Sequence, residues 1–140
     1  MRSRSVRATW EEGLRCTVDA GGFPLTVDEP RSVGGSDQGP QPTDLLLASV
    51  SSCFTVALAY CAARQGVELV DLRVTATGVY DGPRFASVRI EVSSGCERAA
   101  LTQLITAAEK VCYVTNTLRR APEIEVALAE ERHRAEVPDA

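Results

Sequence analysis

The most reactive side chains in this sequence are five cysteines: Cys16, Cys53, Cys61, Cys96 and Cys112. A thiolate is a strong nucleophile, and its oxidation leads through a sulfenic acid to a disulfide when a second thiol is near. No two of the cysteines form a C-x-x-C pair, and the single histidine, His133, lies in a charged tail, so the spacing of a zinc site is absent. We therefore expect thiol chemistry without a metal or a cofactor.

The cysteines differ in their surroundings. Cys53 lies in the uncharged stretch 45–63, where a thiol is ordinarily a small buried hydrophobe. Cys61 follows eight residues later, about 12 Å along a helix axis, which is too far for a disulfide to Cys53. Cys112 ends a later amphipathic segment. If the two helices pack together, Cys53 and Cys112 meet as an attacking and a resolving thiol, and the sequence leaves that contact open.

The first half of the chain predicts strands, a loop and a long helix. Short alternating stretches predict antiparallel strands at residues 5–10, 14–18 and 23–27. The Gly- and Pro-rich segment 30–42 predicts a loop. Pro42 suits the first position of a helix, and Asp44 places a negative charge in its first turn. We expect this helix to run to Arg64 and to end at Gly66.

The second half predicts a hairpin and a second helix. Two alternating runs, 69–79 and 85–92, flank an Asp-Gly turn at 81–82. Capping residues at 93–95 precede a helix with apolar residues at helical spacing up to Val111. Cys96, near that helix start, is expected to be a loop or capping residue. A short helical turn through Leu118 and a last strand at residues 124–128 complete the expected elements.

This order of elements predicts an α+β fold with antiparallel sheet in one domain, residues 1–140, of which about 131–140 form a frayed charged tail. The net charge of −4 and the scattered arginines argue against a nucleic-acid partner. The stretch 45–63 is long enough to span a membrane. Its four Ser and Thr residues and the absence of flanking Lys or Arg clusters favour a buried core helix instead. With no secretory signal, we expect a cytoplasmic protein.

Two segments together resemble the OsmC/Ohr family. They are GGSDQGPQPTDLLLASVSSC at residues 34–53 and AAEKVCYVTNTL at 107–118. The similarity extends in element order over roughly residues 5–128. It implies antiparallel sheets wrapped around buried central helices in an intertwined homodimer, with active sites at the subunit interface.

The resemblance also implies an activity, the thiol-dependent reduction of organic hydroperoxides. By analogy, Cys53 is the peroxidatic thiolate, which attacks the peroxide and becomes a sulfenic acid. Cys112 then condenses with it to a disulfide, and a dithiol reductant, lipoyl-type or similar, reopens that bond. The chemistry requires a lowered pKa at Cys53.

The sequence departs from the best-known family members at the positions that tune this thiol. They supply an arginine from the N-terminal strands, for which Arg15 and Arg31 are the candidates here. They also carry a glutamate after the helix-opening proline, where this chain has Thr43, and the adjacent Asp44 is rotated by about 100° on a helix. Tyr113 stands where many relatives have proline. These departures indicate a distinct OsmC-like branch and leave an alternative open, a non-catalytic binding protein for a small lipophilic ligand.

Overall fold

The computed structural model describes residues 1–130. Its elements, in chain order, are β1 (Arg7–Glu12), β2 (Arg15–Ala20), β3 (Phe23–Val27), the short 3-10 helix η1 (Arg31–Val33), α1 (Pro42–Gln65), β4 (Arg73–Tyr80), β5 (Phe85–Ser93), α2 (Arg98–Val111) and α3 (Tyr113–Arg119). The predicted α+β class with antiparallel sheets is confirmed. The tail predicted at 131–140 lies outside the described residues.

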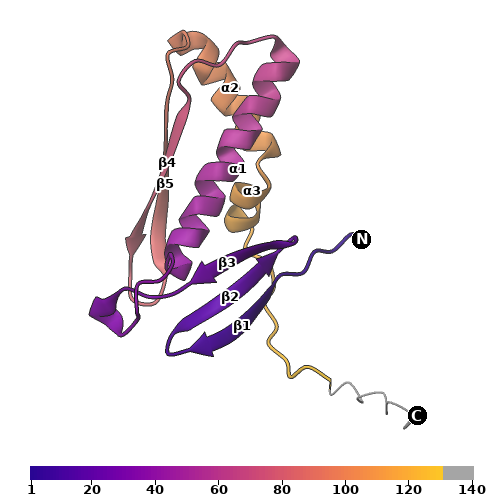
Figure 1. The fold of residues 1–140 in the computed structure, drawn as a ribbon. Helices are drawn as coiled ribbons and strands as arrows, with labels where there is room; N and C mark the ends of the chain where they lie inside the picture. The colour runs from indigo at the N-terminus through magenta and orange to yellow at the C-terminus, as the bar shows by residue number, and fades with distance from the viewer. Residues whose placement is uncertain (131–140) are drawn as a thin grey trace, which may run out of the picture.

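The N-terminal sheet has the strand order β1-β2-β3 and stands at the foot of α1 (Figure 1). Tight turns join its strands, with positive φ at Gly13, Gly21 and Gly22. Its large apolar side chains remain outside: Trp10 is 71% exposed and Phe23 is 74% exposed. Within the described chain, this sheet is therefore left without a covering layer.

A buried carboxylate organises the loop between β3 and α1. Asp28 is 1% exposed and accepts hydrogen bonds from the backbone N–H groups of Glu29, Ser36 and Gln38 at 2.8, 3.4 and 3.2 Å. The bond from Glu29, with those from Gln38 and Ser36 and the charge of Arg15, lowers the pKa of Asp28, although burial opposes the shift. The loop thus has a fixed course to the start of α1.

The long helix α1 begins and ends as local chemistry predicts. Pro42 is the first residue after an extended Gln41, and Gly66 closes the helix in the left-handed conformation (φ 69°), with its N–H bonded to the Ala62 carbonyl. By length and composition α1 is apolar enough to cross a membrane. One side of it packs on α2, α3 and β4. The buried cluster at this contact comprises Phe54, Ala57, Leu58, Cys61, Ala62, Leu104, Ala108 and Cys112.

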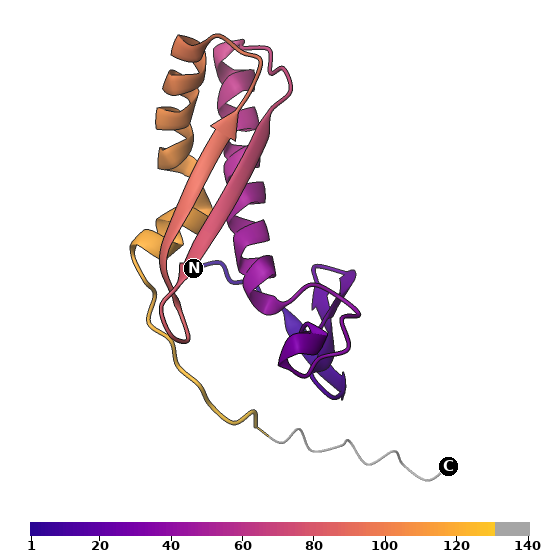
Figure 2. The same cartoon turned by 90° about the vertical axis from the view of Figure 1, so that its left-hand side faces the viewer.

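The predicted hairpin is β4 and β5, which lie lengthwise against the helices (Figure 2). In its turn, the N–H of Asp81 bonds to the carbonyl of Arg84, and Gly82 has a φ of 60°. Strand β4 starts at Arg73, later than the predicted residue 69. The reason is local, because Asp71 adopts a left-handed φ of 46° that interrupts the extended backbone.

Two local predictions are wrong. Residues 93–95 do not cap α2, whose N-cap is Glu97, without a side-chain hydrogen bond. Instead, the Ser94 hydroxyl and the Gly95 N–H both bond to the Val70 carbonyl. The predicted strand at 124–128 is not a strand in this structure, and its Ile124, Val126 and Leu128 are 83%, 93% and 98% exposed. The alternating pattern is present, but no sheet edge of the described chain pairs with it.

Candidate active site

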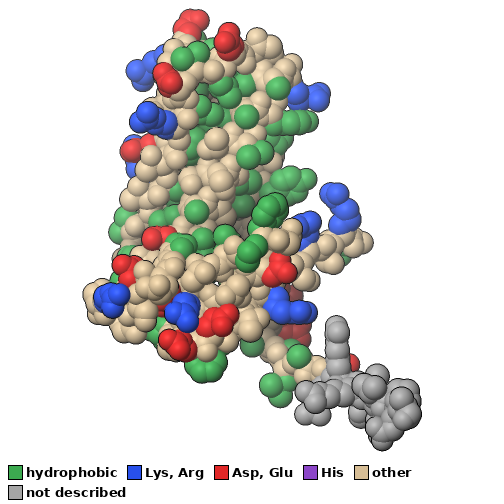
Figure 3. All heavy atoms as spheres, in the orientation of Figure 1, with side chains coloured by type: hydrophobic (Ala, Val, Ile, Leu, Met, Phe, Trp, Pro, Cys, Tyr) green, Lys and Arg blue, Asp and Glu red, His purple; other side chains and the backbone are tan. Residues whose placement is uncertain are grey.

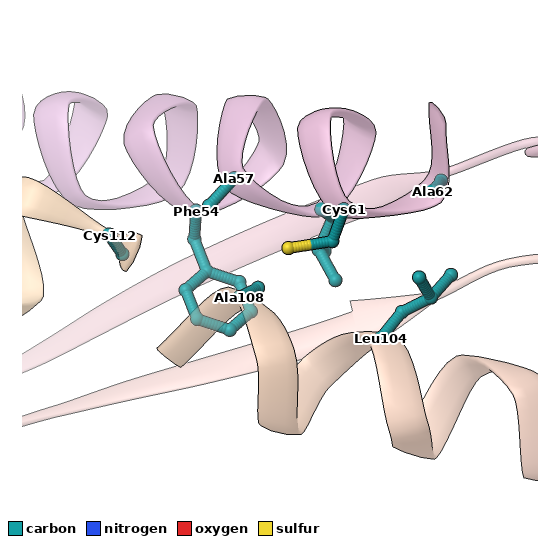
Figure 4. Close-up of a cluster of buried hydrophobic side chains, with 8 residues drawn as sticks. Phe54, Ala57, Cys61, Ala62, Leu104, Ala108 and Cys112 are labelled. Atoms are coloured by element: carbon teal, nitrogen blue, oxygen red, sulfur yellow. The ribbon is translucent and has the colours of Figure 1, made fainter. Parts of the chain in front are cut away.

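Cys112 occupies the junction of two helices. It is at once the C-cap of α2 and the N-cap of α3, with an extended backbone (φ −75°, ψ 108°). Its N–H bonds to the Ala108 carbonyl, and its own carbonyl accepts the Asn116 N–H at 3.1 Å. The side chain is 1% exposed and belongs to the buried cluster that includes Phe54 of α1 (Figure 4). The interruption of the helix at Cys112, between α2 and α3, therefore holds this thiol against α1.

Cys53 lies on α1, next to Cys112. It packs on the buried cluster that contains Cys112, and the two side chains are close enough for each to affect the pKa of the other; both cysteines are free thiols. Cys53 is half-buried and lines a cavity, whereas Cys112 is sealed. A molecule arriving from solvent thus meets Cys53 first, with Cys112 directly behind it.

Within one chain, the pKa values of the two thiols shift in opposite directions from the ordinary value of a cysteine. Burial raises the pKa of Cys53, and the neighbouring Cys112 raises it further, against the N–H groups of Val114 and Tyr113. Burial also raises the pKa of Cys112, but the polar surroundings of the thiol, supplied by Thr115, Cys53 and the Val114 N–H, outweigh it, so the pKa of Cys112 is lowered overall. Residues 1–130 of the same chain, which the structure describes, therefore do not supply the lowered pKa that a peroxidatic Cys53 requires.

The cavity in front of Cys53 has a volume of about 570 Å³, within the usual range for small-molecule sites. It is lined by Cys53, Val56, Ala57, Tyr60, Lys110, Val111, Tyr113 and Asn116. Most of these side chains are apolar or aromatic, and Lys110 is the one charged residue among them. In the view of Figure 3, hydrophobic side chains gather along the middle of the molecule and charges lie mainly toward its ends. The site suits an apolar molecule.

The other predicted site residues lie elsewhere in the chain. Arg15, in β2, is 3.9 Å from Glu12, and Arg31 lies in η1 beside the N-terminal sheet. Asp44 is in the first turn of α1, nine residues before Cys53, about 13 Å along the helix axis. The structure of one chain brings none of these three to Cys53. The two arginines are distant because the N-terminal sheet stands at the foot of α1 (Figure 1), and Asp44 is distant because it lies more than two helical turns before Cys53.

Thr43 stands where the family resemblance implies a glutamate, and its side chain has a hydrogen-bond partner in this structure. Its hydroxyl forms a 2.8 Å hydrogen bond with the Tyr80 hydroxyl at the end of β4. The Tyr80 ring in turn packs on Phe85 with centroids 4.7 Å apart. The residue at this position is thus engaged with the hairpin.

Sequence reasoning missed several residues of the cavity, among them Tyr60, Lys110 and Asn116. Tyr60 follows Cys53 by seven residues, which places both on one face of a helix, and this spacing was a usable signal. Lys110 and Asn116 flank the helix junction at Cys112. Their approach to Cys53 depends on how α2 and α3 pack on α1, and no local pattern indicates it.

Comparison with known proteins identifies the family. The pattern that defines the family described as OsmC-like protein matches residues 35–127, the segment that contains both thiols. The chain belongs to the OsmC-like family. The match covers the hairpin and also α1, α2 and α3, the three helices whose residues line the cavity.

Individual relatives have low sequence identity to this chain. The uncharacterized protein YmaD of Bacillus subtilis is 27% identical over 63 residues, 45% of this chain and 42% of that protein, so the match spans about two fifths of YmaD. The OsmC-like protein of Mycoplasma pneumoniae is 19% identical with a TM-score of 0.71, over 86% of this chain and 89% of that one. An organic hydroperoxide resistance protein of Elizabethkingia anophelis is 24% identical with a TM-score of 0.63, over 85% and 89%. These likenesses show the fold.

Proposed function

We propose that this protein is a thiol-dependent peroxidase that reduces organic hydroperoxides. The observation that carries the proposal is the arrangement of two free thiols, Cys53 facing an apolar cavity and Cys112 buried behind it. This is the order in which an attacking and a resolving thiol must stand. Membership of a family that includes organic hydroperoxide resistance proteins supports the same reading.

The proposed cycle uses each thiol once. The Cys53 thiolate attacks the terminal peroxide oxygen, the O–O bond breaks, and the alkoxide leaves as an alcohol after taking a proton. Cys53 becomes a sulfenic acid. The Cys112 thiolate then attacks the Cys53 sulfur, hydroxide leaves as water, and a disulfide forms. A dithiol of the lipoyl type reopens this disulfide by exchange and is itself oxidised to a disulfide.

We further propose that a second copy of the chain completes the site. The uncovered N-terminal sheet and the unpaired apolar segment 124–128 support an intertwined homodimer. In such a dimer, Arg15 or Arg31 of one copy reaches Cys53 of the other and stabilises its thiolate. We place this cycle in the cytoplasm, where thiols are kept reduced.

Turnover tests the proposal directly. The purified protein, supplied with dihydrolipoamide, is expected to consume cumene hydroperoxide, and Cys53→Ser is expected to abolish consumption. Cys96→Ser is the matched control and should keep it, because Cys96 bonds to the Glu68 carbonyl away from the cavity. A wild type inactive with several hydroperoxides and several dithiols rejects the peroxidase.

The second candidate is a non-catalytic binding protein for a small lipophilic ligand. Two observations favour it, the raised pKa of Cys53, caused first by burial, and the hydrogen bond of Thr43 to Tyr80 in place of a glutamate. On this reading, Cys53→Ala binds a lipophilic ligand as tightly as the wild type, and neither protein turns over a hydroperoxide. Loss of binding together with loss of turnover favours the peroxidase.

A further inference from the structure

A second cavity adjoins the one in front of Cys53. It measures about 600 Å³ and is lined by Thr106, Glu109, Lys110, Asn116, Arg119 and Arg120. Lys110 and Asn116 line both cavities, so the two share a wall at the junction of α2 and α3. The Asn116 side-chain amide donates to the Lys110 carbonyl at 3.3 Å, which ties α3 to the end of α2 at this wall.

The two cavities differ in chemistry. The first is mainly apolar and holds the reactive thiol, whereas every residue that lines the second is polar or charged. Among the residues that the structure describes, the second brings three cations, Lys110, Arg119 and Arg120, together with a single carboxylate, Glu109. This local excess of positive charge occurs in a chain whose net charge is −4.

These cations lack counter-ions in the described chain. The ion pairs within residues 1–130 are Arg15–Glu12, Arg84–Asp81 and Arg89–Glu91, and none involves the second cavity. Lys110 and Arg119 lie in the last turns of α2 and α3, where the helix dipoles stabilise positive charge. Convergence of three cations on one recess nevertheless costs repulsion, which a bound anion relieves.

We infer that Lys110, Arg119 and Arg120 form an anion subsite that selects hydroperoxides bearing a carboxylate. The apolar body and the peroxide group lie in the cavity with Cys53, and the carboxylate reaches the cations across the shared wall. Lys110 lies between the two cavities, and its long flexible side chain can place the ammonium group in either one. The two arginines offer planar guanidinium donors to a carboxylate. This inference rests on the proposed peroxidase function.

A matched substrate pair tests the subsite. We compare kcat/KM for cumene hydroperoxide with that for its para-carboxylate, which has the same reacting group and one added charge. The wild type is expected to prefer the carboxylate by about tenfold, and about 0.5 M salt should reduce the preference by screening. In the triple variant Lys110→Gln, Arg119→Gln, Arg120→Gln, the ratio of the two constants should fall to about one.

Two further variants serve as controls. Lys110→Arg retains the charge and should retain the preference. Arg98→Gln removes a cation at the far end of α2, outside both cavities, and should also retain it. A wild type without preference, or a triple variant that keeps it while folded by circular dichroism, overturns the inference.

A binding experiment separates failure of the subsite from failure of the peroxidase. By calorimetry, para-isopropylbenzoate should bind the wild type about tenfold more tightly than neutral para-isopropylbenzamide, and the triple variant should lose this difference. If no hydroperoxide is turned over but the difference is found, the subsite stands and the peroxidase is rejected. Equal affinities in the wild type reject the subsite, whatever the turnover.

Discussion

Cys53 packs against the buried cluster that contains Cys112, across the contact between α1 and the α2–α3 junction. Cys53 is partly exposed and Cys112 is buried, and the pKa of the buried Cys112 is the one that is lowered. In the proposed cycle, a peroxide reaches Cys53, and the Cys112 thiolate then attacks the Cys53 sulfur from the buried side.

Replacement of the resolving thiol should stop the cycle after its first step. In Cys112→Ser, Cys53 is still oxidised by one equivalent of hydroperoxide, but the disulfide cannot form. We expect multiple turnover with dihydrolipoamide to fall on the order of 10²-fold. Mass spectrometry after dimedone trapping should show the sulfenic acid at Cys53, and an unslowed cycle with no trapped adduct contradicts the assigned order of the thiols.

The pH dependence of Cys53 alkylation should reveal whether an arginine of a second copy of the chain stabilises the thiolate. Burial, with the neighbouring Cys112, raises the pKa of Cys53 in one chain, so its thiolate fraction at neutral pH is small without outside help. If a second copy supplies an arginine, either Arg15→Ala or Arg31→Ala raises the alkylation midpoint of Cys53 by about 1–3 pH units. The other variant serves as the control. Identical alkylation profiles in both variants and the wild type count against arginine activation.

Dimer formation should depend on the apolar segment at the end of the described chain. Ile124 and Val126 are 83% and 93% exposed, and alternation makes them suited to a strand that pairs with another copy. The double variant Ile124→Asp, Val126→Asp should shift the protein toward the monomer in sedimentation equilibrium. Glu125→Ala, between them on the opposite face, is the control and should leave the assembly intact.

The buried carboxylate of Asp28 should make stability depend on pH. Its backbone hydrogen bonds, led by that from Glu29, lower its pKa below the ordinary value of an aspartate in the folded protein. Its contribution is therefore present above the pKa of the unfolded chain and is lost as the pH falls through the folded pKa. Asp28→Asn should lower the urea midpoint at pH 7, and the difference from wild type should shrink at pH 3 and below.

Asp37→Asn is the matched control for this loop. Asp37 has a left-handed φ of 56°, a conformation that asparagine tolerates as well as aspartate. Its replacement should leave the urea midpoint near that of the wild type. A pH-independent effect of Asp28→Asn contradicts the assigned role of its charge.

Packing of α2 on α1 should be costly to disturb. Leu104 is fully buried at the contact, so Leu104→Ala is expected to lower the free energy of unfolding by about 2–5 kcal/mol. Leu104→Met keeps most of the volume and should cost less than about 1.5 kcal/mol. Equilibrium urea denaturation measures both, and equal small losses would show that this contact is not tightly packed.

The sequence by itself determined the features that depend on neighbours in the chain. Pro42 and Gly66 set the limits of α1 because the constraint of a proline ring and the left-handed freedom of glycine act on their own backbone. The Asp81-Gly82 turn specified the hairpin for the same reason. Cys53 could thus be placed on a helix, and the two-cysteine pattern pointed to the family.

Only the tertiary structure decided what stands around that cysteine. The contact of Cys53 with Cys112, the cavity wall at Lys110 and the direction of each thiol's pKa arise where α1, α2 and α3 pack together. The exposure of residues 124–128 likewise follows from which sheet edges lie within reach. These properties depend on residues far apart in the chain, and local propensity carries no information about which of them come together or what charge they bring.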